Sequence, residues 1–215
     1  MRKEEFVRIF RDTIVEWSKL HERELLDYEA YRWKSKTYEE SVRARKELEE
    51  AIKSSRKKNG GGIDLATADR IYRWGFGRPF AMRDEKAVLE ATREAFRFLE
   101  EGDCYQACNR LMRIKGIGIA GATKILGLSN QEKFCIFDSR VGHALSDLTQ
   151  DGEKIIRCPP GRSIKGDHVV KKHQWALDYQ KLVWTLEIVH DHLKEKAPNC
   201  RIADIEMALF TKGKG

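Results

Sequence analysis

The chain has 215 residues, 41% of them hydrophobic, which is enough apolar surface for one or two domains to fold without disulfides or metals. Its 41 Lys and Arg against 34 Asp and Glu give a formal net charge of +7, compatible with a polyanionic partner but insufficient to establish one. No stretch of about 18 apolar residues and no apolar signal-peptide run is present. We therefore expect an intracellular protein, cytoplasmic or nucleoid-associated, without membrane contact.

The first part of the chain predicts scaffold helices. Apolar residues recur every three to four positions over residues 4–32, and a narrower apolar stripe runs over 38–57. Basic residues followed by a glycine run predict a loop at 54–62. Asp64 is a good N-cap for the next helix, which the glycine- and proline-containing segment 75–79 should end.

The remaining elements are also predicted to be helical, over residues 84–100, 104–113, 173–194 and 202–210. A long loop rich in proline, glycine and cations is expected over 151–172. Only the weak run EKIIRC resembles a strand. The predicted fold class is therefore all-α.

The five cysteines are odd in number and lie in a long chain, which argues against a disulfide framework. Cys104 and Cys108 are spaced as metal ligands on a helix could be, but no second Cys/His pair follows at zinc-like spacing. We interpret them as reduced, buried residues on one helical face and predict no protein metal site.

Residues 111–126 read LMRIKGIGIAGATKIL, which predicts a helix, a tight glycine turn and a second helix. Gly116 and Gly118 allow backbone N–H groups to approach a phosphate that a Cβ would obstruct. The second helix begins at once, so its positive N-terminal end faces the same anion. A plain αα-corner with a glycine C-cap is the alternative interpretation, because a lone G-x-G is weak evidence.

Apolar and small residues complete this pattern. Ile114 and Ile117 are expected to anchor the turn on the neighbouring helix, and 120–122 are small enough for close helix packing. After the second helix, an apolar run ends at Asp138, which opens a predicted helix over 139–145. Because Asp is a favoured N-cap, Asp138 alone indicates no more than a helix cap.

Taken together, the segments IKGIG and FDSRV resemble the helix–hairpin–helix DNA glycosylase superfamily. Its signature joins a leucine-proline-glycine-valine-glycine type hairpin to a valine-aspartate-threonine-histidine type segment. In that superfamily the catalytic aspartate follows, at a characteristic distance, a position that is lysine in bifunctional members. Ala120 occupies the lysine position here and Asp138 the aspartate position. The resemblance is close over 111–145 and loose elsewhere.

The resemblance implies a two-lobed all-α fold with a cleft between the lobes. One lobe would comprise residues 1–62 and 138–215, and the other 63–137, which carries the hairpin at 104–126. The substrate would be a nucleotide rotated out of double-stranded DNA by a monomeric enzyme. The residues expected to bind the DNA backbone are Lys115, Gly116, Ile117, Gly118, Ala120, Gly121 and Arg140.

The implied reaction is hydrolysis of the bond between base and sugar, in base-excision repair. Positive charge develops on the sugar, and Asp138 would stabilise it and position water. Ala120 in place of lysine implies a monofunctional enzyme, with Lys124, one turn later on the same helical face, as the alternative nucleophile. The four-cysteine loop of some members is absent, so no iron–sulfur cluster is expected; a monovalent or divalent cation at the hairpin stays open.

Stacking on an extruded base requires aromatic side chains, and Trp74, Phe76 and Phe80 are the candidates, with core packing as the alternative. Trp33 or Tyr38 is a second choice. Arg140, with His143 one turn later, could contact the phosphate beside the extruded nucleotide; the alternatives are a solvated Arg140 and a core-packed His143.

Two other functions remain open. In one, the hairpin binds DNA without catalysis and Asp138 is only a cap. In the other, the chain is a helical adaptor for proteins whose glycine turn has no ligand. The sequence does not indicate which base would be excised.

Overall fold

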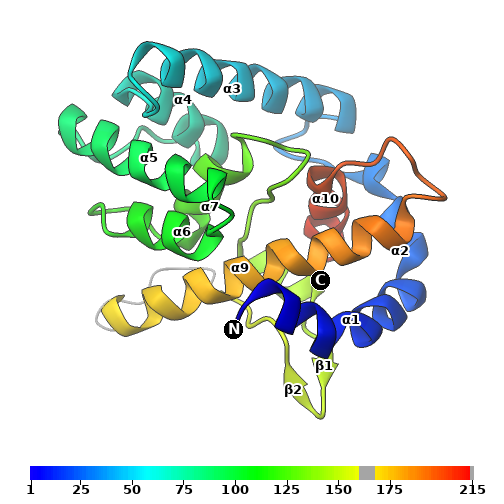
Figure 1. Cartoon of the computed structure of the whole chain (residues 1–215). Coiled ribbons are helices and arrows are strands. Elements are labelled where there is room, and N and C mark those ends of the chain that lie inside the picture. The colour runs from blue at the N-terminus through cyan, green and yellow to red at the C-terminus, as the bar shows by residue number, and fades with distance from the viewer. Residues whose placement is uncertain (160–167, 214–215) are drawn as a thin grey trace.

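The computed structural model describes residues 1–159 and 168–213. Within these ranges its regular secondary structure is helical apart from one short β-hairpin and an isolated bridge between Trp33 and Lys36 (Figure 1). This confirms the all-α class. The helices of the N-terminal part are α1 (Lys3–Leu20), α2 (Glu22–Leu26), the 3₁₀ helix η1 (Tyr28–Ala30) and α3 (Tyr38–Lys58). Thr37 and Glu40 form a capping box that starts α3. Helix α3 continues through residues 54–58, so the loop predicted there is shorter than expected.

The next two helices begin and end where the sequence predicts. Helix α4 (Leu65–Phe76) starts at Asp64, whose Oδ1 accepts a hydrogen bond from Thr67 N at 2.8 Å. It ends at Gly77, which has a left-handed φ of +68° that favours glycine. Helix α5 (Glu85–Glu100) is capped in the same way by Asp84.

The remaining helices are α6 (Cys104–Met112), α7 (Ile119–Gly127), α8 (Ser139–Ala144), α9 (His168–Leu193) and α10 (Ile202–Lys212). Strands β1 (Thr149–Gln150) and β2 (Glu153–Lys154) pair antiparallel. The weak strand signal thus coincides with β2. Helix α9 begins within the segment predicted as a loop over 151–172, and residues 160–167 of that loop lie outside the described residues.

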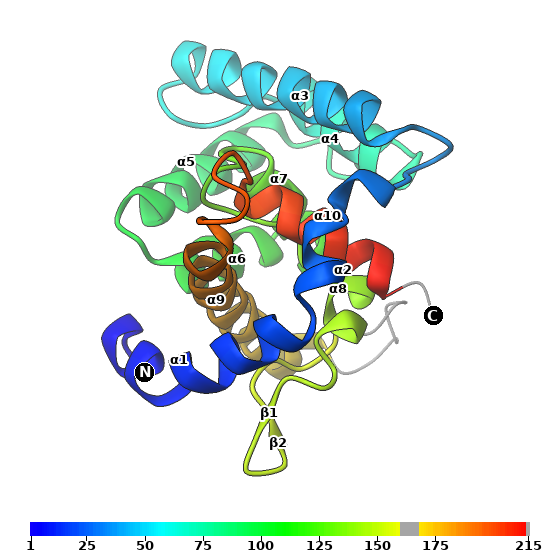
Figure 2. The ribbon, with the colours of Figure 1, turned by 90° about the vertical axis from the view of Figure 1, so that its right-hand side faces the viewer.

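Helix α9 crosses the molecule and packs against α1 and α6, while α10 packs against α8, α2 and η1 (Figures 1 and 2). Helix α3 lies on the far side from the β-hairpin, next to α4. One hydrophobic cluster extends from Phe6 to Phe210 and includes both Cys104 and Cys108, as predicted. Burial raises the pKa of the Cys104 thiol to about 12. Among the described residues, no helix is long and apolar enough to cross a bilayer.

Candidate functional site

A glycine-containing turn, residues 113–118, joins α6 to α7. Gly116 has a φ of +88°, a conformation that L side chains rarely adopt, so glycine is needed there for the turn itself. Gly118 differs, because its φ of −96° suits any residue, and a Cβ on it would meet no atom within 4 Å. The folded chain therefore gives no steric reason for glycine at 118, whereas close approach of a ligand would.

Helix α7 meets the solvent at its N-terminal end, where Gly118 is exposed and Ala120 is partly exposed, while the rest of its first turn is buried. Its N-cap is Gly118, which has no side chain to bond the free N–H groups of the helix. Lys115, Gly116 and Gly118 are exposed, while Ile114 and Ile117 are 6% and 2% exposed and anchor the turn in the core. The turn thus presents backbone N–H groups and one lysine on a fixed base.

Helix α7 also fixes the segment that leads to Asp138. Thr123 Oγ1 accepts a hydrogen bond from Phe137 N at 3.0 Å and is within 3.2 Å of Phe137 O. A Cβ on Gly127 would lie 2.6 Å from Cys135 O, so only glycine lets the segment pack this closely. The turn and Asp138 are therefore held by the same helix, a connection that sequence reasoning missed.

Asp138 is the N-cap of α8, as the alternative interpretation required. Its Oδ1 accepts hydrogen bonds from Arg140 N at 3.0 Å and Val141 N at 3.2 Å. No described residue donates a hydrogen bond to Oδ2. One carboxylate oxygen thus caps the helix, and the other is left for a further partner.

Asp138 lines a narrow pocket whose other walls are mostly aromatic or charged: Tyr31, Trp33, Arg45, Trp74, Lys124, Ile136, Glu206 and Phe210. Its free volume is about 10 Å³, close to the space of one water molecule. A nucleobase would enter only if side chains at the mouth moved. Trp33 precedes two consecutive non-glycine residues with positive φ, Lys34 at +50° and Ser35 at +66°.

An ion pair closes one wall of this pocket. Arg45 Nη1 donates to Glu206 Oε2 at 2.6 Å and Arg45 Nη2 donates to Glu206 Oε1 at 3.2 Å. The two side chains are 2% and 1% exposed, so the pair is buried and ties α3 to α10. The apolar stripe over 38–57 predicts only a scaffold helix, and no sequence pattern points to Arg45 or Glu206.

Three N–H donors of the residues that line the pocket are buried without a hydrogen-bond partner in the described part of the chain. They are Arg45 Nε, Trp33 Nε1 and Trp74 Nε1. A buried donor without a partner costs about 1–3 kcal/mol, and such a group often marks a place where water or a ligand binds. All three groups donate, so a suitable ligand would present acceptor atoms.

Lys124 is the remaining charged group of the pocket and is only 5% exposed. Its Nζ lies 4.7 Å from the centroid of the Phe76 ring, and no described residue forms a hydrogen bond or ion pair with it. Burial lowers the pKa of the Lys124 amine, and attraction by Asp138 and Glu206 offsets this only in part.

Only some of the aromatic residues predicted for the base pocket line it. Trp74 and Trp33 do, whereas Phe80 is 1% exposed and packs on Tyr72 with ring centroids 4.6 Å apart. Phe76 contributes its ring to Lys124, outside the set that lines the pocket. Tyr38 donates a hydrogen bond to Asp204 Oδ1 at 2.9 Å.

At the predicted DNA-binding positions, Ala120 is partly exposed, and Gly121 is buried where a Cβ would lie 2.2 Å from Tyr72 Oη. Gly121 thus serves the packing of α7 on α4. Arg140 is exposed, with its guanidinium 4.6 Å from the centroid of Phe210, a pocket residue. His143 is also exposed, so its interpretation as a core residue was wrong.

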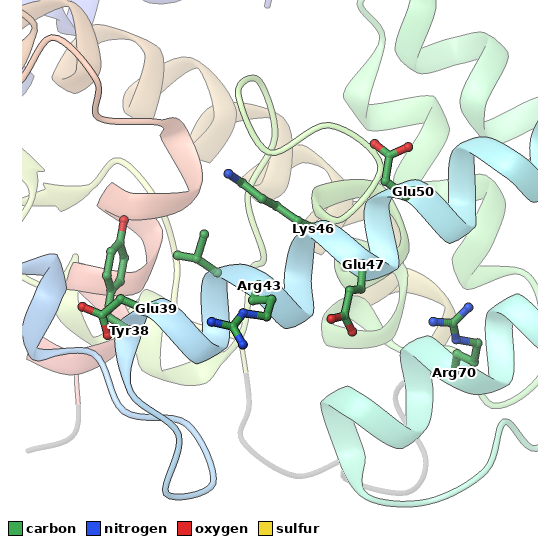
Figure 3. Close-up of a pocket in the computed structure, with 8 residues that line it drawn as sticks. Tyr38, Glu39, Arg43, Lys46, Glu47, Glu50 and Arg70 are labelled. Atoms are coloured by element: carbon green, nitrogen blue, oxygen red, sulfur yellow. The ribbon is translucent and has the colours of Figure 1, made fainter.

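A second hollow lies along α3 and α4, lined by Tyr38, Glu39, Val42, Arg43, Lys46, Glu47, Glu50 and Arg70 (Figure 3). Charged side chains of both signs are spread along α3 there rather than directed at one point. Except for Tyr38, it contains none of the residues singled out from the sequence. We therefore do not assign it a function.

No family model, no curated protein and no solved structure matches this chain. The turn and the pocket therefore provide the evidence for function.

Proposed function

We propose that the chain is a DNA glycosylase of the base-excision type, in which Asp138 stabilises the positive charge that develops on the sugar as the base leaves. The observation that carries this proposal is that the two oxygens of the Asp138 carboxylate differ in their hydrogen bonds. Oδ1 caps α8, while Oδ2 has no hydrogen bond among the described residues. A capped and positioned carboxylate with one free oxygen suits an oxocarbenium-like transition state.

The turn at 113–118 supports DNA as the substrate. In this proposal it is a helix–hairpin–helix element whose exposed Gly118 and uncapped α7 N-terminus bind a backbone phosphate. Lys115 adds a positive charge beside it, and Arg140 on the rim of the pocket could bind a second phosphate. Such contacts fix the position of the duplex without reading its sequence.

The pocket supports extrusion of a base. Trp33, Trp74 and Phe210 offer flat surfaces for stacking, and their elements lie in different parts of the chain. Because the three unpartnered groups are donors, the preferred base would carry carbonyl oxygens or unprotonated ring nitrogens. Entry requires the walls to open, and the Trp33 segment is our candidate for the moving part. The two-lobed division remains part of this proposal.

A non-catalytic DNA-binding module is the second candidate, favoured by the small free volume of about 10 Å³. A panel of duplexes, each with one damaged or modified base, separates the two functions. We expect free base to be released from at least one duplex, detected by chromatography. Binding to every duplex without release of any base would favour the binding module.

A further inference from the structure

Helix α4 contains a slot that accommodates the Lys124 side chain. The slot is formed at Gly75, where a Cβ would lie 2.5 Å from Lys124 Cδ and 2.6 Å from Lys124 Cε. Gly75 is the next-to-last residue of α4, and its φ is outside the left-handed region, so the backbone conformation does not call for glycine there. The missing Cβ instead leaves room for the Lys124 side chain.

The occupant is an unusual one for a protein interior. Lysine is rarely buried without a partner, because removing its charge from water is expensive. Here the stem lies against Gly75, the Phe76 ring covers the amine at 4.7 Å, and no carboxylate is paired with it among the described residues. A role confined to packing would be met better by methionine or leucine.

Lys124 shares the pocket with Asp138. Both residues line it, and the Asp138 and Glu206 carboxylates attract the Lys124 charge while Arg45 and Lys34 oppose it. Desolvation of a lysine and the proximity of other cations are both established ways to make its amine nucleophilic. A larger neutral fraction near pH 7 follows from the lowered pKa.

We propose that Lys124 is an amine nucleophile, and that the chain cleaves abasic sites through an imine between Lys124 Nζ and C1′ of the deoxyribose. This inference rests on the proposed function, and it replaces the monofunctional reaction that Ala120 implied with a two-step one. Lys124 lies one helical turn further along α7 than the lysine position of the family that the sequence resembles.

The steps balance without a further reactant. The Nζ lone pair attacks C1′, the bond from C1′ to the base breaks, and the base leaves with that electron pair and takes up a proton. One amine proton is transferred to O4′ as the C1′–O4′ bond breaks with its electron pair on O4′, which opens the sugar ring and leaves a protonated imine. Removal of a C2′ proton to solvent expels the 3′-phosphate, and water hydrolyses the imine to restore Lys124. An abasic aldehyde enters the same sequence by losing water.

The test uses a duplex with a preformed abasic site and sodium borohydride, so it does not depend on which base is excised. We expect a covalent protein–DNA adduct that peptide mass spectrometry maps to Lys124. Lys124→Met and Lys124→Arg should both lose the adduct, whereas Lys133→Met, which changes an exposed lysine, should keep it.

An adduct on another amine, an adduct retained by both Lys124 variants, or no adduct on a duplex that is bound would each overturn the proposal. These outcomes differ from failure of the proposed function, which is measured as base release. If base is released with dependence on Asp138 and no adduct forms at Lys124, the glycosylase proposal stands and water is the nucleophile.

Discussion

The side chain of Lys124 on α7 packs directly against Gly75 on α4, and a Cβ on residue 75 would lie 2.5 Å from Lys124 Cδ. The sequence alone does not predict this contact, because α5 and α6 separate the two helices along the chain. The pair connects the packing of two helices to the chemistry of the pocket, because Lys124 and Asp138 line the same space.

Replacing Gly75 with alanine should affect stability differently with and without the Lys124 side chain. In the Lys124→Ala background, Gly75→Ala should raise the free energy of unfolding by up to about 0.5 kcal/mol, because alanine prefers the helical conformation more than glycine does and residue 75 lies in the last turn of α4. In the wild-type chain the new Cβ must displace the outer part of the Lys124 side chain, so the same change should be less favourable than in the Lys124→Ala background. Urea unfolding of the four proteins measures this coupling, and simple additivity would mean that the slot has no role.

Lys124→Met should raise the melting temperature at pH 7, by about 2–4 °C for each kcal/mol gained. The reason is that burial lowers the pKa of Lys124 below its unfolded value, so a proton must be lost or a charge desolvated on folding. The loss in free energy of unfolding has its full size when the pH is below the pKa of Lys124 in the folded chain. It disappears as the pH rises towards about 10.4, the pKa of lysine in the unfolded chain.

The difference in melting temperature between Lys124→Met and the wild type should therefore shrink as pH rises through the lowered pKa of Lys124. Calorimetry between pH 6 and pH 10 records it, with Lys133→Met as the control that shows no such trend. A wild-type chain more stable than Lys124→Met at neutral pH would mean that Lys124 has a structural role.

The two glycines of the turn should separate stability from DNA binding. Gly116→Ala should lower the free energy of unfolding by about 1–2 kcal/mol, because alanine is strained at a φ of +88°. Gly118→Ala should leave stability unchanged, since its Cβ meets nothing within 4 Å, yet weaken binding to all DNA sequences alike. Fluorescence anisotropy with several duplexes measures this effect. Unchanged affinity for Gly118→Ala would exclude a phosphate at this turn.

Trp74→Phe keeps a ring in the pocket and removes one unpartnered N–H. Base release should fall by up to about tenfold for bases that present an acceptor to this wall, and little for others. Trp17→Phe is the matched control, because Trp17 Nε1 already donates to Asp147 Oδ1 at 2.9 Å outside the pocket. An equal loss for all bases in Trp74→Phe would indicate stacking alone.

Local signals in the sequence predicted most helix boundaries, because caps and glycine turns depend on neighbouring residues. Asp64, Asp84 and Asp138 each cap the helix that was predicted to follow them. The positive φ of Gly116 is likewise a local property of the turn. The same-face position of Lys124 and Ala120 follows from helical periodicity, but only Lys124 is among the residues that line the pocket.

The walls of the pocket could not be predicted in this way. Arg45 lies among exposed charged residues of α3, and its partner Glu206 is 161 residues away. Phe80 follows the glycine- and proline-containing segment, but its N–H bonds to Asp69 Oδ1 at 2.8 Å and its ring turns into the core. Both outcomes depend on contacts between distant helices, for which no local pattern exists.

Asp138→Asn tests the central proposal most directly. Asparagine is as good an N-cap as aspartate, so α8 and the melting temperature should be preserved, and the turn should bind DNA as before. Measured as free base released in a single turnover, the rate should fall by about 100-fold or more, because the amide cannot stabilise the cationic sugar. An Asp138→Asn protein that is folded, binds DNA and releases base at the wild-type rate would contradict the proposal.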